Sequence, residues 1–298
     1  MDNSQDYRLM ERDVQVILDV YKYRYLSVSQ ITSLHFPSIQ MARRRLRLLT
    51  ADGYLAGFTA PGITERMYYL DRRGAEAVTS YLRVPIGGLK WSRSARAPKD
   101  YYFLKHFLQN NDFRIVLSKA CSAPDSEIDL LGYIPEYYSE KTGKGGVVKY
   151  IKDFVCDIRN PARLIHHTPD SVFALERDGK SALFFLEIDR GTEVLTNPDK
   201  GFLKCLQFYL NYWVGGKYQR YGEDFNCEPF KAFRTLIVTT SQTRVDNMRQ
   251  AAASVYVDPP MVKRFIWLTS DDRLDQDTIF QPVWQSADIT DSSYYKIG

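Results

Sequence analysis

The stretch HTPDSVFALERDGKSALFFLEIDR, residues 167–190, organises the larger part of this 298-residue chain. Residues 171–176 alternate apolar with small or polar side chains. Residues 182–186 form a continuous apolar run, which is typical of a strand buried on both faces. Between them, Asp178-Gly179 is a two-residue motif of the kind that closes a hairpin. The stretch therefore predicts two antiparallel strands within a sheet.

Three carboxylates lie at the far ends of this predicted hairpin. Asp170 stands where the first strand begins, and Glu187 and Asp189 stand where the second strand ends. Because strands joined by a tight turn run antiparallel, these two ends lie side by side. Carboxylates at such short distances repel one another unless a cation lies between them. We therefore expect Asp170, Glu187 and Asp189 to converge at one edge of the sheet.

This arrangement resembles the PD-(D/E)xK nuclease core, whose motif has Pro-Asp on one strand and Glu-x-Lys on the next. Pro169-Asp170 and Glu187-Ile188 match the motif, whereas Asp189 stands where the lysine of that family would be. The wider string FFLEIDRGTE, followed by a helix with Lys204 and aromatic residues, resembles the replication-relaxation family of plasmids and integrative mobile elements. The resemblance implies a winged helix followed by a PD-(D/E)xK nuclease-like α/β domain.

The nuclease resemblance also implies a chemistry, which is hydrolysis of a phosphodiester with a metal ion and an activated water. Asp170 and Glu187 are oxygen ligands of the type that Mg²⁺ prefers. With Asp189 in the place of the lysine, the best substitute is Lys204, since Lys180 lies at the opposite end of the hairpin. The candidate catalytic residues are Asp170, Glu187, Asp189 and Lys204, and the candidate Mg²⁺ ligands are Asp170, Glu187 and Asp189.

Each of these residues also has a structural interpretation. Asp189 and Arg190 could form an ion pair at the strand end, and Asp170 could cap a turn. Lys204 could simply neutralise Glu187 or Asp189. A nuclease-like fold that has lost its lysine can persist as a DNA-binding or assembly scaffold, because a fold does not by itself establish a function.

The first third of the chain has the element order of a winged helix. The patterns predict helices at 10–22, near SQITSLHF (29–36) and at 39–51, then a hairpin of YLAGF and RMYYL, then a helix at 75–82. In this fold the third helix enters the major groove of DNA and the hairpin contacts the backbone. The candidate buried side of the third helix consists of Met41, Leu46, Leu48 and Leu49.

Positive charge is concentrated in the same third of the chain. Residues 1–98 hold 15 Lys and Arg against 9 Asp and Glu, a balance of +6, whereas residues 99–298 hold 25 against 27, a balance of −2. This asymmetry is expected of a nucleic-acid-binding module joined to another domain. Winged helices also dock proteins, and an arginine run is often only a solvated face. The candidate DNA-binding residues are Arg43, Arg44, Arg45, Arg47, Arg72 and Arg73.

The patterns predict three parts: a winged-helix domain at 1–83, a basic linker at 84–98 with Lys90, Arg93 and Arg96, and a nuclease-like domain at 99–298. In the last part, 122–147 has little pattern. The predicted strands and helices of that part are a helix at 101–120, a strand at 149–158, the hairpin, a helix at 199–213, a strand at 230–240, a helix at 243–255 and a strand at 264–269.

Composition narrows the function classes. The apolar runs are too short to span a bilayer, and the polar start MDNSQDYRLMERD does not resemble a secretory signal, so we expect a cytoplasmic protein with no membrane partner. The four cysteines lack zinc spacing, and the adjacent pair His166-His167 is not spaced to bind one metal, so the spacing predicts no histidine or cysteine metal site.

Together these features predict a DNA-binding protein of a mobile genetic element that acts in plasmid replication or relaxosome assembly. Its partners would be double-stranded DNA and replication or relaxosome proteins. One alternative is a Mg²⁺-dependent DNA endonuclease, and another is a transcriptional regulator or protein-docking adaptor. The sequence predicts neither the DNA site recognised nor the oligomeric state.

Overall fold

The computed structural model describes residues 9–89, 91, 101–141, 143, 146–197, 200–255 and 260–298. It divides into two compact units, Met1–Ile115 and Val116–Gly298, each of which has a hydrophobic core of its own. Of the predicted linker, residues 90 and 92–98 lie outside the described residues, and these include Lys90, Arg93 and Arg96. None of the helices described combines the length and hydropathy needed to cross a membrane.

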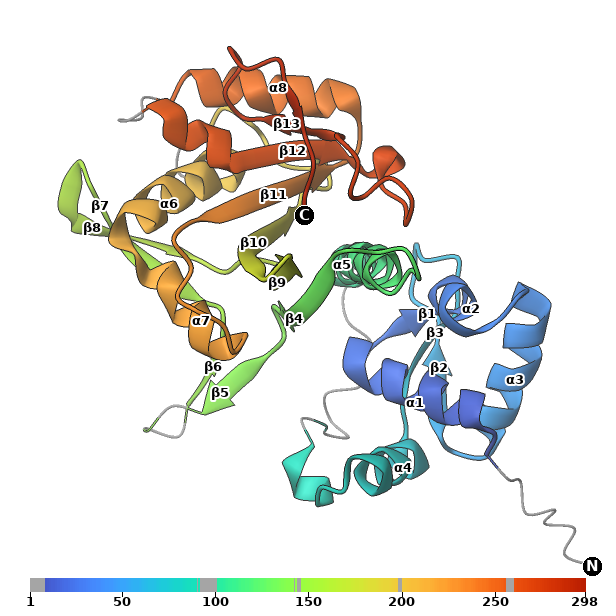
Figure 1. Ribbon diagram of the computed structural model, residues 1–298. Helices are drawn as coiled ribbons and strands as arrows, with labels where there is room; N and C mark the ends of the chain where they lie inside the picture. Colours follow the sequence, from blue (N-terminus) through green and yellow to red (C-terminus); the bar gives the residue numbers. More distant parts are fainter. Residues whose placement is uncertain are drawn as a thin grey trace, which may run out of the picture. The chain divides into compact units, whose positions relative to one another are not determined.

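The first unit is a winged helix (Figure 1). Its three-stranded sheet has the order β1-β3-β2, and both of its strand pairs are antiparallel. The helices are α1 (Glu11–Tyr23), α2 (Val28–His35), α3 (Ile39–Ala51) and α4 (Arg72–Leu82), and the strands are β1 (Leu26–Ser27), β2 (Leu55–Phe58) and β3 (Met67–Leu70).

Polar side chains cap the starts of α2, α3 and α4. The hydroxyls of Ser27 and Ser38 accept hydrogen bonds from the amides of Gln30 and Met41 at the starts of α2 and α3. The carboxylate of Asp71 does the same at the start of α4. These caps satisfy amides that have no partner inside a helix, so the starts of the three helices follow from local hydrogen bonding. The helix α4 begins at Arg72, three residues before its predicted start at 75.

The buried side of α3 differs from the prediction. Ala42, Leu46 and Leu49 are fully buried, whereas Met41 and Leu48 are 49% and 42% exposed. The buried residues follow each other at intervals of four and three, which keeps them on one helical face. The predicted burial of Met41 and Leu48 was therefore wrong, and the alanine that the prediction passed over lies on the buried face.

The helix α5 (Tyr101–Cys121) contributes its first part to the first unit. The Asn111 side chain donates to the carbonyls of Tyr23 and Tyr25, at 3.3 and 2.7 Å. Gln30 donates to the carbonyl of Leu108 at 2.9 Å. These bonds satisfy main-chain carbonyls that would otherwise be buried without a partner. The unit boundary thus falls inside α5, whereas the sequence patterns assign this helix to the second domain.

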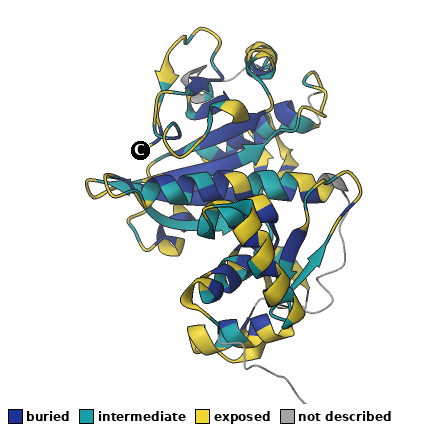
Figure 2. Ribbon diagram, turned by 90° about the vertical axis from the view of Figure 1, so that its right-hand side faces the viewer, coloured by how far each residue is buried: buried dark blue, intermediate teal, exposed yellow. Residues whose placement is uncertain are grey.

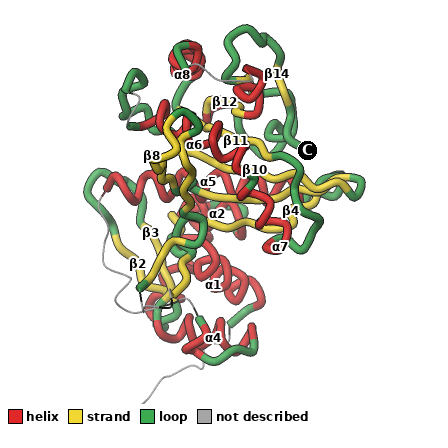
Figure 3. The backbone as a smooth tube through the Cα atoms, turned by 90° about the vertical axis from the view of Figure 1, so that its left-hand side faces the viewer, coloured by secondary structure: helices red, strands yellow, loops and turns green. Residues whose placement is uncertain are grey.

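The second unit is an α/β domain around a seven-stranded sheet with the order β14-β13-β12-β11-β10-β9-β4 (Figures 1 and 3). The pairs β10–β11 and β11–β12 are parallel and the others antiparallel. Its strands are β4 (Asp129–Pro135), β9 (Ser171–Arg177), β10 (Lys180–Ile188), β11 (Phe233–Thr239), β12 (Ile266–Ser270), β13 (Trp284–Ser286) and β14 (Tyr294–Tyr295).

Further elements surround this sheet. The helices are α6 (Gly201–Gly215), α7 (Tyr221–Asp224) and α8 (Gln242–Ala253). Four more strands form two separate two-stranded antiparallel sheets. One sheet pairs β5 (Ser139–Lys141) with β6 (Val147–Lys149), and the other pairs β7 (Asp153–Asp157) with β8 (Asn160–His167).

The predicted hairpin of β9 and β10 is confirmed. Lys180 pairs with Arg177 next to the turn, and Leu186 pairs with Ser171 at the far end. Asp178 and Gly179 both have positive φ, 51° and 70°, which is the backbone of the two-residue turn that matches strand twist. Residue 170, just before β9, and residue 187, near the end of β10, therefore lie at the same edge of the sheet.

The strand predicted at 149–158 is present as β7, but it does not belong to the main sheet. That stretch contains β7, which pairs with β8 in a separate two-stranded sheet, and the sheet strand beside β9 is β4, in the part with little pattern. The register of β4 shifts between Leu130 and Gly132, which breaks its alternation. A Cβ on Gly132 would lie 2.7 Å from the ring of Phe225. Tertiary packing therefore selects this irregular strand.

The two faces of the hairpin bury different side chains. Leu183 and Phe185 lie in the core that also contains residues of α6 and α8. On the alternate side of β10, Phe184 stacks on Phe173 with ring centres 5.1 Å apart. Figure 2 shows the sheet strands among the buried parts of the chain. Burying each large apolar side chain contributes about 1.5–3 kcal/mol, so β10 is a rigid support for the residues at its ends.

Candidate functional site

One candidate surface is the exposed side of α3. Arg43, Arg44 and Arg47 are exposed there, because Ala42, Leu46 and Leu49 occupy the buried side. Nearby, burial raises the pKa of Tyr68, although the positive charges of Arg66, Arg43 and Arg47 act in the opposite direction. The structure thus brings α3 arginines and the exposed Arg66 of the β2–β3 hairpin into one electrostatic environment.

Arg45 has a different role from its neighbours. Its guanidinium binds the carboxylate of Asp13 through Nε at 2.5 Å and also through Nη2, and Asp13 is fully buried. Losing one partner of a buried pair leaves an uncompensated charge, at a cost of about 3–5 kcal/mol. The structure therefore places Arg45 between α3 and α1, where it holds the fold, rather than with the exposed arginines.

The candidate DNA-binding residues Arg72 and Arg73 also differ in their contacts. Arg72 is exposed and forms a surface ion pair with Glu76 at 3.1 Å, an interaction that contributes little to stability. Arg73 donates to the carbonyl of Asp52 at 2.9 Å and lies over the ring of Tyr54, 4.7 Å from its centre. Arg73 thus fixes the loop after α3, whereas Arg72 is available to a partner.

The wing residue Arg66 was missed in the sequence. It donates to the carbonyl of Gly57 across the β2–β3 pair at 3.3 Å. Beside it, burial raises the pKa of Glu65, but bonds from Ser29 and the charge of Arg43 outweigh this and lower it. Arg66 is the first residue of the predicted strand RMYYL, so its place in the wing was visible in the sequence, but its closeness to α3 depends on the tertiary fold.

A second candidate site surrounds Glu187 at the end of β10. His167, the last residue of β8, places its Nε2 atom 2.6 Å from Oε1 of Glu187. The Tyr209 hydroxyl of α6 donates to the same oxygen. The Sγ atom of Cys205, also on α6, lies 4.0 Å from Nε2 of His167. These four side chains form the Glu187 cluster.

Burial dominates the electrostatics of the Glu187 cluster. Burial raises the pKa of Glu187, although His167 acts against this. Burial also lowers the pKa of His167, but the charge and hydrogen bond of Glu187 outweigh it, so the net direction is upward. The pKa values of Cys205 and Tyr209 are raised chiefly by burial, and then by Glu187. The thiol and phenol thus stay protonated, and one proton shared by Glu187 and His167 leaves the pair neutral.

Asp170 lies beside the cluster, as the hairpin predicts. Its side chain accepts a hydrogen bond from the amide of Ile188 at 2.7 Å, and its own amide donates to the carbonyl of Leu186. Its charge contributes to the raised pKa of both Glu187 and His167. Asp170 and Glu187 are therefore brought together, with Asp170 also fixing the strand end.

Asp189 is not brought into the cluster. Its carboxylate accepts two hydrogen bonds from Arg244 of α8, at 3.0 and 3.2 Å, and one from Thr239 at 2.6 Å. The sequence suggested an ion pair at this strand end, but with Arg190. Lys204 lies close enough for its charge to lower the pKa of His167, and it makes no ion pair with any residue that the structure describes.

The types of donor atom around Glu187 indicate which metal ions this group could bind. Nε2 of His167, Oε1 of Glu187 and Sγ of Cys205 all lie within 4.8 Å of one another. Imidazole and thiolate are ligands of transition metals, whereas Mg²⁺ prefers oxygens. The sequence spacing predicts no such group, because His167 and Cys205 lie on different elements, β8 and α6. The only local indication of this group was that His167 lies three residues before Asp170 in the sequence.

The segments that build these two sites also carry the likeness to known proteins. No curated protein matches the chain. The family model for replication-relaxation matches residues 18–225, which is more than half of the chain. The match includes most of the winged helix, the β9–β10 hairpin and α6. The chain therefore belongs to the replication-relaxation family.

Proposed function

We propose that this protein binds double-stranded DNA through α3 and the β2–β3 wing and acts in the replication of a mobile element. The observation that supports this most is the exposed group of Arg43, Arg44 and Arg47 on the third helix of a winged helix. In that fold, the third helix enters the major groove. Family membership supports the replication role and, as finer proposals, a plasmid origin or relaxosome with its proteins as partners.

The arginines have separate expected contacts. Residues 43 and 47 share a helical face because they are four apart, and residues 44 and 47 are three apart. At least one of them would reach base edges, while the others, with Arg66 and Arg72, would contact phosphates. Phosphate contacts supply affinity and salt dependence, whereas base contacts supply sequence choice. Arg45 and Arg73 would act indirectly, by holding α3 and the following loop.

Binding of the full chain to double-stranded DNA at several salt concentrations tests this proposal. The double variant Arg43→Ala plus Arg47→Ala should bind with a Kd weaker by about tenfold or more, and its salt slope should be smaller by about one for each arginine that no longer neutralises a phosphate. Lys152→Ala removes an exposed charge from the second unit and serves as the control. If the full chain binds no DNA at low salt, the proposal fails and the adaptor function is favoured.

A second candidate function is a Mg²⁺-dependent DNA endonuclease in the second unit. It is favoured by the closeness of Asp170 and Glu187 at one sheet edge, with Lys204 acting on the same cluster. The two carboxylates fit the ion in ligand type, and they would hold it. A bound ion would supply an activated water. Asp189, the third predicted ligand, is bound by Arg244, and Glu187 would have to release His167.

Nicking of supercoiled plasmid DNA in Mg²⁺ or Mn²⁺ tests the endonuclease. Cleavage should disappear in Glu187→Gln, which keeps the size of the side chain, and persist in Glu140→Gln, which changes an exposed acid on β5. Loss of cleavage in Lys204→Ala would give that amine a role. If the protein binds DNA but does not nick it in either metal, the endonuclease proposal is wrong and only the DNA-binding function is supported.

A further inference from the structure

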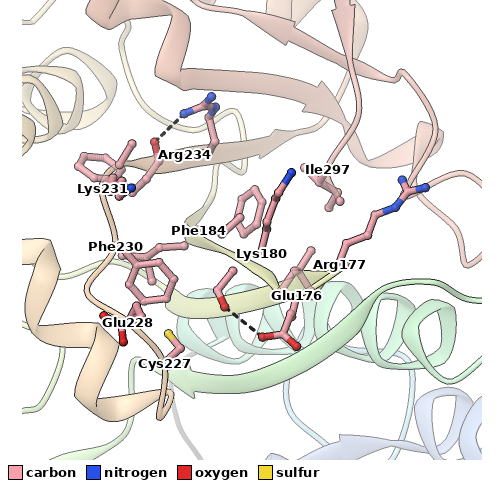
Figure 4. Close-up of a pocket in the computed structure, with 18 of the residues that line it drawn as sticks. Glu176, Arg177, Lys180, Phe184, Cys227, Glu228, Phe230, Lys231, Arg234 and Ile297 are labelled. Atoms are coloured by element: carbon pink, nitrogen blue, oxygen red, sulfur yellow. Dashed lines mark hydrogen bonds between the residues drawn. The ribbon is translucent and has the colours of Figure 1, made fainter.

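A cavity of about 770 Å³ lies at the turn end of the β9–β10 hairpin, the end away from Glu187 (Figure 4). Its lining comes from both strands of the hairpin, from the 226–234 segment that leads into β11, from β12 and from residues 296–298. All of these residues belong to the second unit. The volume falls within the range that binds small organic ligands.

The charged side chains of the cavity are mostly basic. Arg177, Lys180, Lys231, Arg234 and Lys296 line it, against Glu176 and Glu228. Arg177 is already bound to Glu127 at 2.5 Å. The three lysines are exposed and form no ion pair with any residue in the described ranges. They therefore present positive charge that the protein itself does not neutralise.

Arg234 is a fixed cation at the wall of the cavity. Its guanidinium lies 4.7 Å from the ring centre of Phe265 and 5.2 Å from that of Trp267. Nη1 donates to the carbonyl of Phe233 at 3.2 Å. The buried Nε has no hydrogen-bond partner among the described residues. The two ring contacts and the bond to Phe233 hold the guanidinium of Arg234 in place.

Apolar side chains form the rest of the surface. Phe184, Phe230, Trp267 and Ile297 line the cavity, and the exposed Ala182 of β10 leaves open space above the strand. Figure 4 shows Lys180 beside Phe184 and Ile297, so an amine and an apolar wall face the same volume. A ligand that combines an apolar part with negative charge would contact both kinds of lining.

We propose that this cavity binds a nucleotide, with its base against the apolar wall and its phosphate among Lys180, Lys231 and Lys296. Bases pack on aromatic surfaces and lysines neutralise phosphates. An inorganic anion would leave the apolar wall unused, and a neutral apolar ligand would leave the lysines unused. Glu228 is exposed and can accept hydrogen bonds from amino or hydroxyl groups of the base or sugar. The site goes beyond the proposed double-stranded DNA binding and does not depend on it.

The nucleotide could be free or part of a single strand, and a titration of the full chain separates the two. Calorimetry would use ADP in one arm and an oligothymidylate of about 12 residues in the other, a length within the site sizes of single-strand binders. The chain would carry Arg43→Ala and Arg47→Ala, so that the first unit contributes little. Lys180→Glu plus Lys296→Glu should weaken the Kd at least about tenfold.

Two controls keep the test decisive. Lys141→Glu plus Lys152→Glu makes the same charge change at exposed positions outside the cavity and should leave the Kd unchanged. Ala182→Trp fills the open space without changing charge and should also weaken binding. Binding of ADP identifies a free nucleotide, and binding of the oligonucleotide alone identifies a strand. If neither binds at millimolar concentration, or if the cavity variants bind as the control does, the proposal is wrong.

Discussion

The two ends of the β9–β10 hairpin have opposite characters. At one end Glu187 is surrounded by His167, Tyr209 and Cys205, and burial is the largest influence on the pKa values of all four groups. At the other end Lys180 is exposed at the border of a cavity. One rigid pair of strands thus carries the buried Glu187 cluster at one end and an open basic site at the other, and the two ends share no residue.

The difference shows what burial does to a charged residue. Oε1 of Glu187 already has two partners, His167 and Tyr209, so the first contribution of Glu187 is to the fold, and a ligand that binds this oxygen must displace them. Lys180 makes no ion pair with the described residues, so its amine can bind a ligand and contributes little to stability. Mutations at the two ends should therefore separate into losses of stability and losses of binding.

The largest expected effect on stability is at the end of the hairpin that carries Glu187. Glu187→Ala should lower the free energy of unfolding by about 3 kcal/mol, because it leaves the His167 ring and the Tyr209 hydroxyl buried without their partner. Lys180→Ala should change it by less than about 0.5 kcal/mol. Urea unfolding of the two variants and the unchanged chain measures both values. Equal losses at the two ends would break the comparison.

The next effect is a dependence of stability on pH. The folded pKa of His167 lies above its ordinary value of 6.5, since Glu187 outweighs burial. Between pH 6.5 and the folded pKa, His167 loses its proton in the unfolded chain but keeps it in the folded protein. Stability should therefore fall as the pH rises from 6.5 through the folded pKa, by at most about 1.4 kcal/mol per pH unit.

The variant His167→Gln sharpens this measurement. Glutamine keeps a hydrogen-bonding side chain but does not titrate, so the free energy of unfolding of this variant should change less over the pH window that begins at 6.5 and extends upward. Urea titrations at several pH values in this window would measure the slope. If the slope is the same with and without His167, another group is responsible for it.

The smallest effect concerns the turn that joins the two ends. Gly179 has a φ of 70°, and a Cβ there would meet nothing within 4 Å. Gly179→Ala should thus cost about 1 kcal/mol through backbone strain alone. Thermal unfolding would detect this as a small drop in Tm, with Ala182→Ser on the same strand as a control. No change in Tm would show that the turn relaxes into another geometry.

Local patterns predicted the hairpin and the helix α3, and they failed where distant contacts decide. Asp178-Gly179 and the apolar run of 182–186 specify the hairpin within a short segment. The strand β4 was missed because its bulge at Gly132 accommodates Phe225, a residue far along the chain. The contribution of α5 to the first unit likewise depends on side chains, such as Asn111, that bind distant carbonyls.

The candidate sites follow the same rule. The closeness of Asp170 and Glu187 follows from antiparallel pairing, so the sequence predicts it. The closeness of His167 to Cys205 depends on how β8 and α6 pack, which no spacing rule describes. Within α3, nothing in the sequence distinguishes Arg45 from its neighbours, because its partner Asp13 lies on another helix. The roles of single residues thus depend on the tertiary fold even where the elements do not.

The pairing of Asp189 with Arg244 has a consequence for how the nuclease motif could be rebuilt. A lysine at position 189 would complete Glu-x-Lys, but it would place a cation against the guanidinium that now binds Asp189 at 3.0 and 3.2 Å. Like charges at that range repel. Restoring the motif would therefore require a coordinated change on α8 as well. Substitutions at residues 189 and 244 are therefore expected to have non-additive effects on stability, because the two side chains contact each other directly.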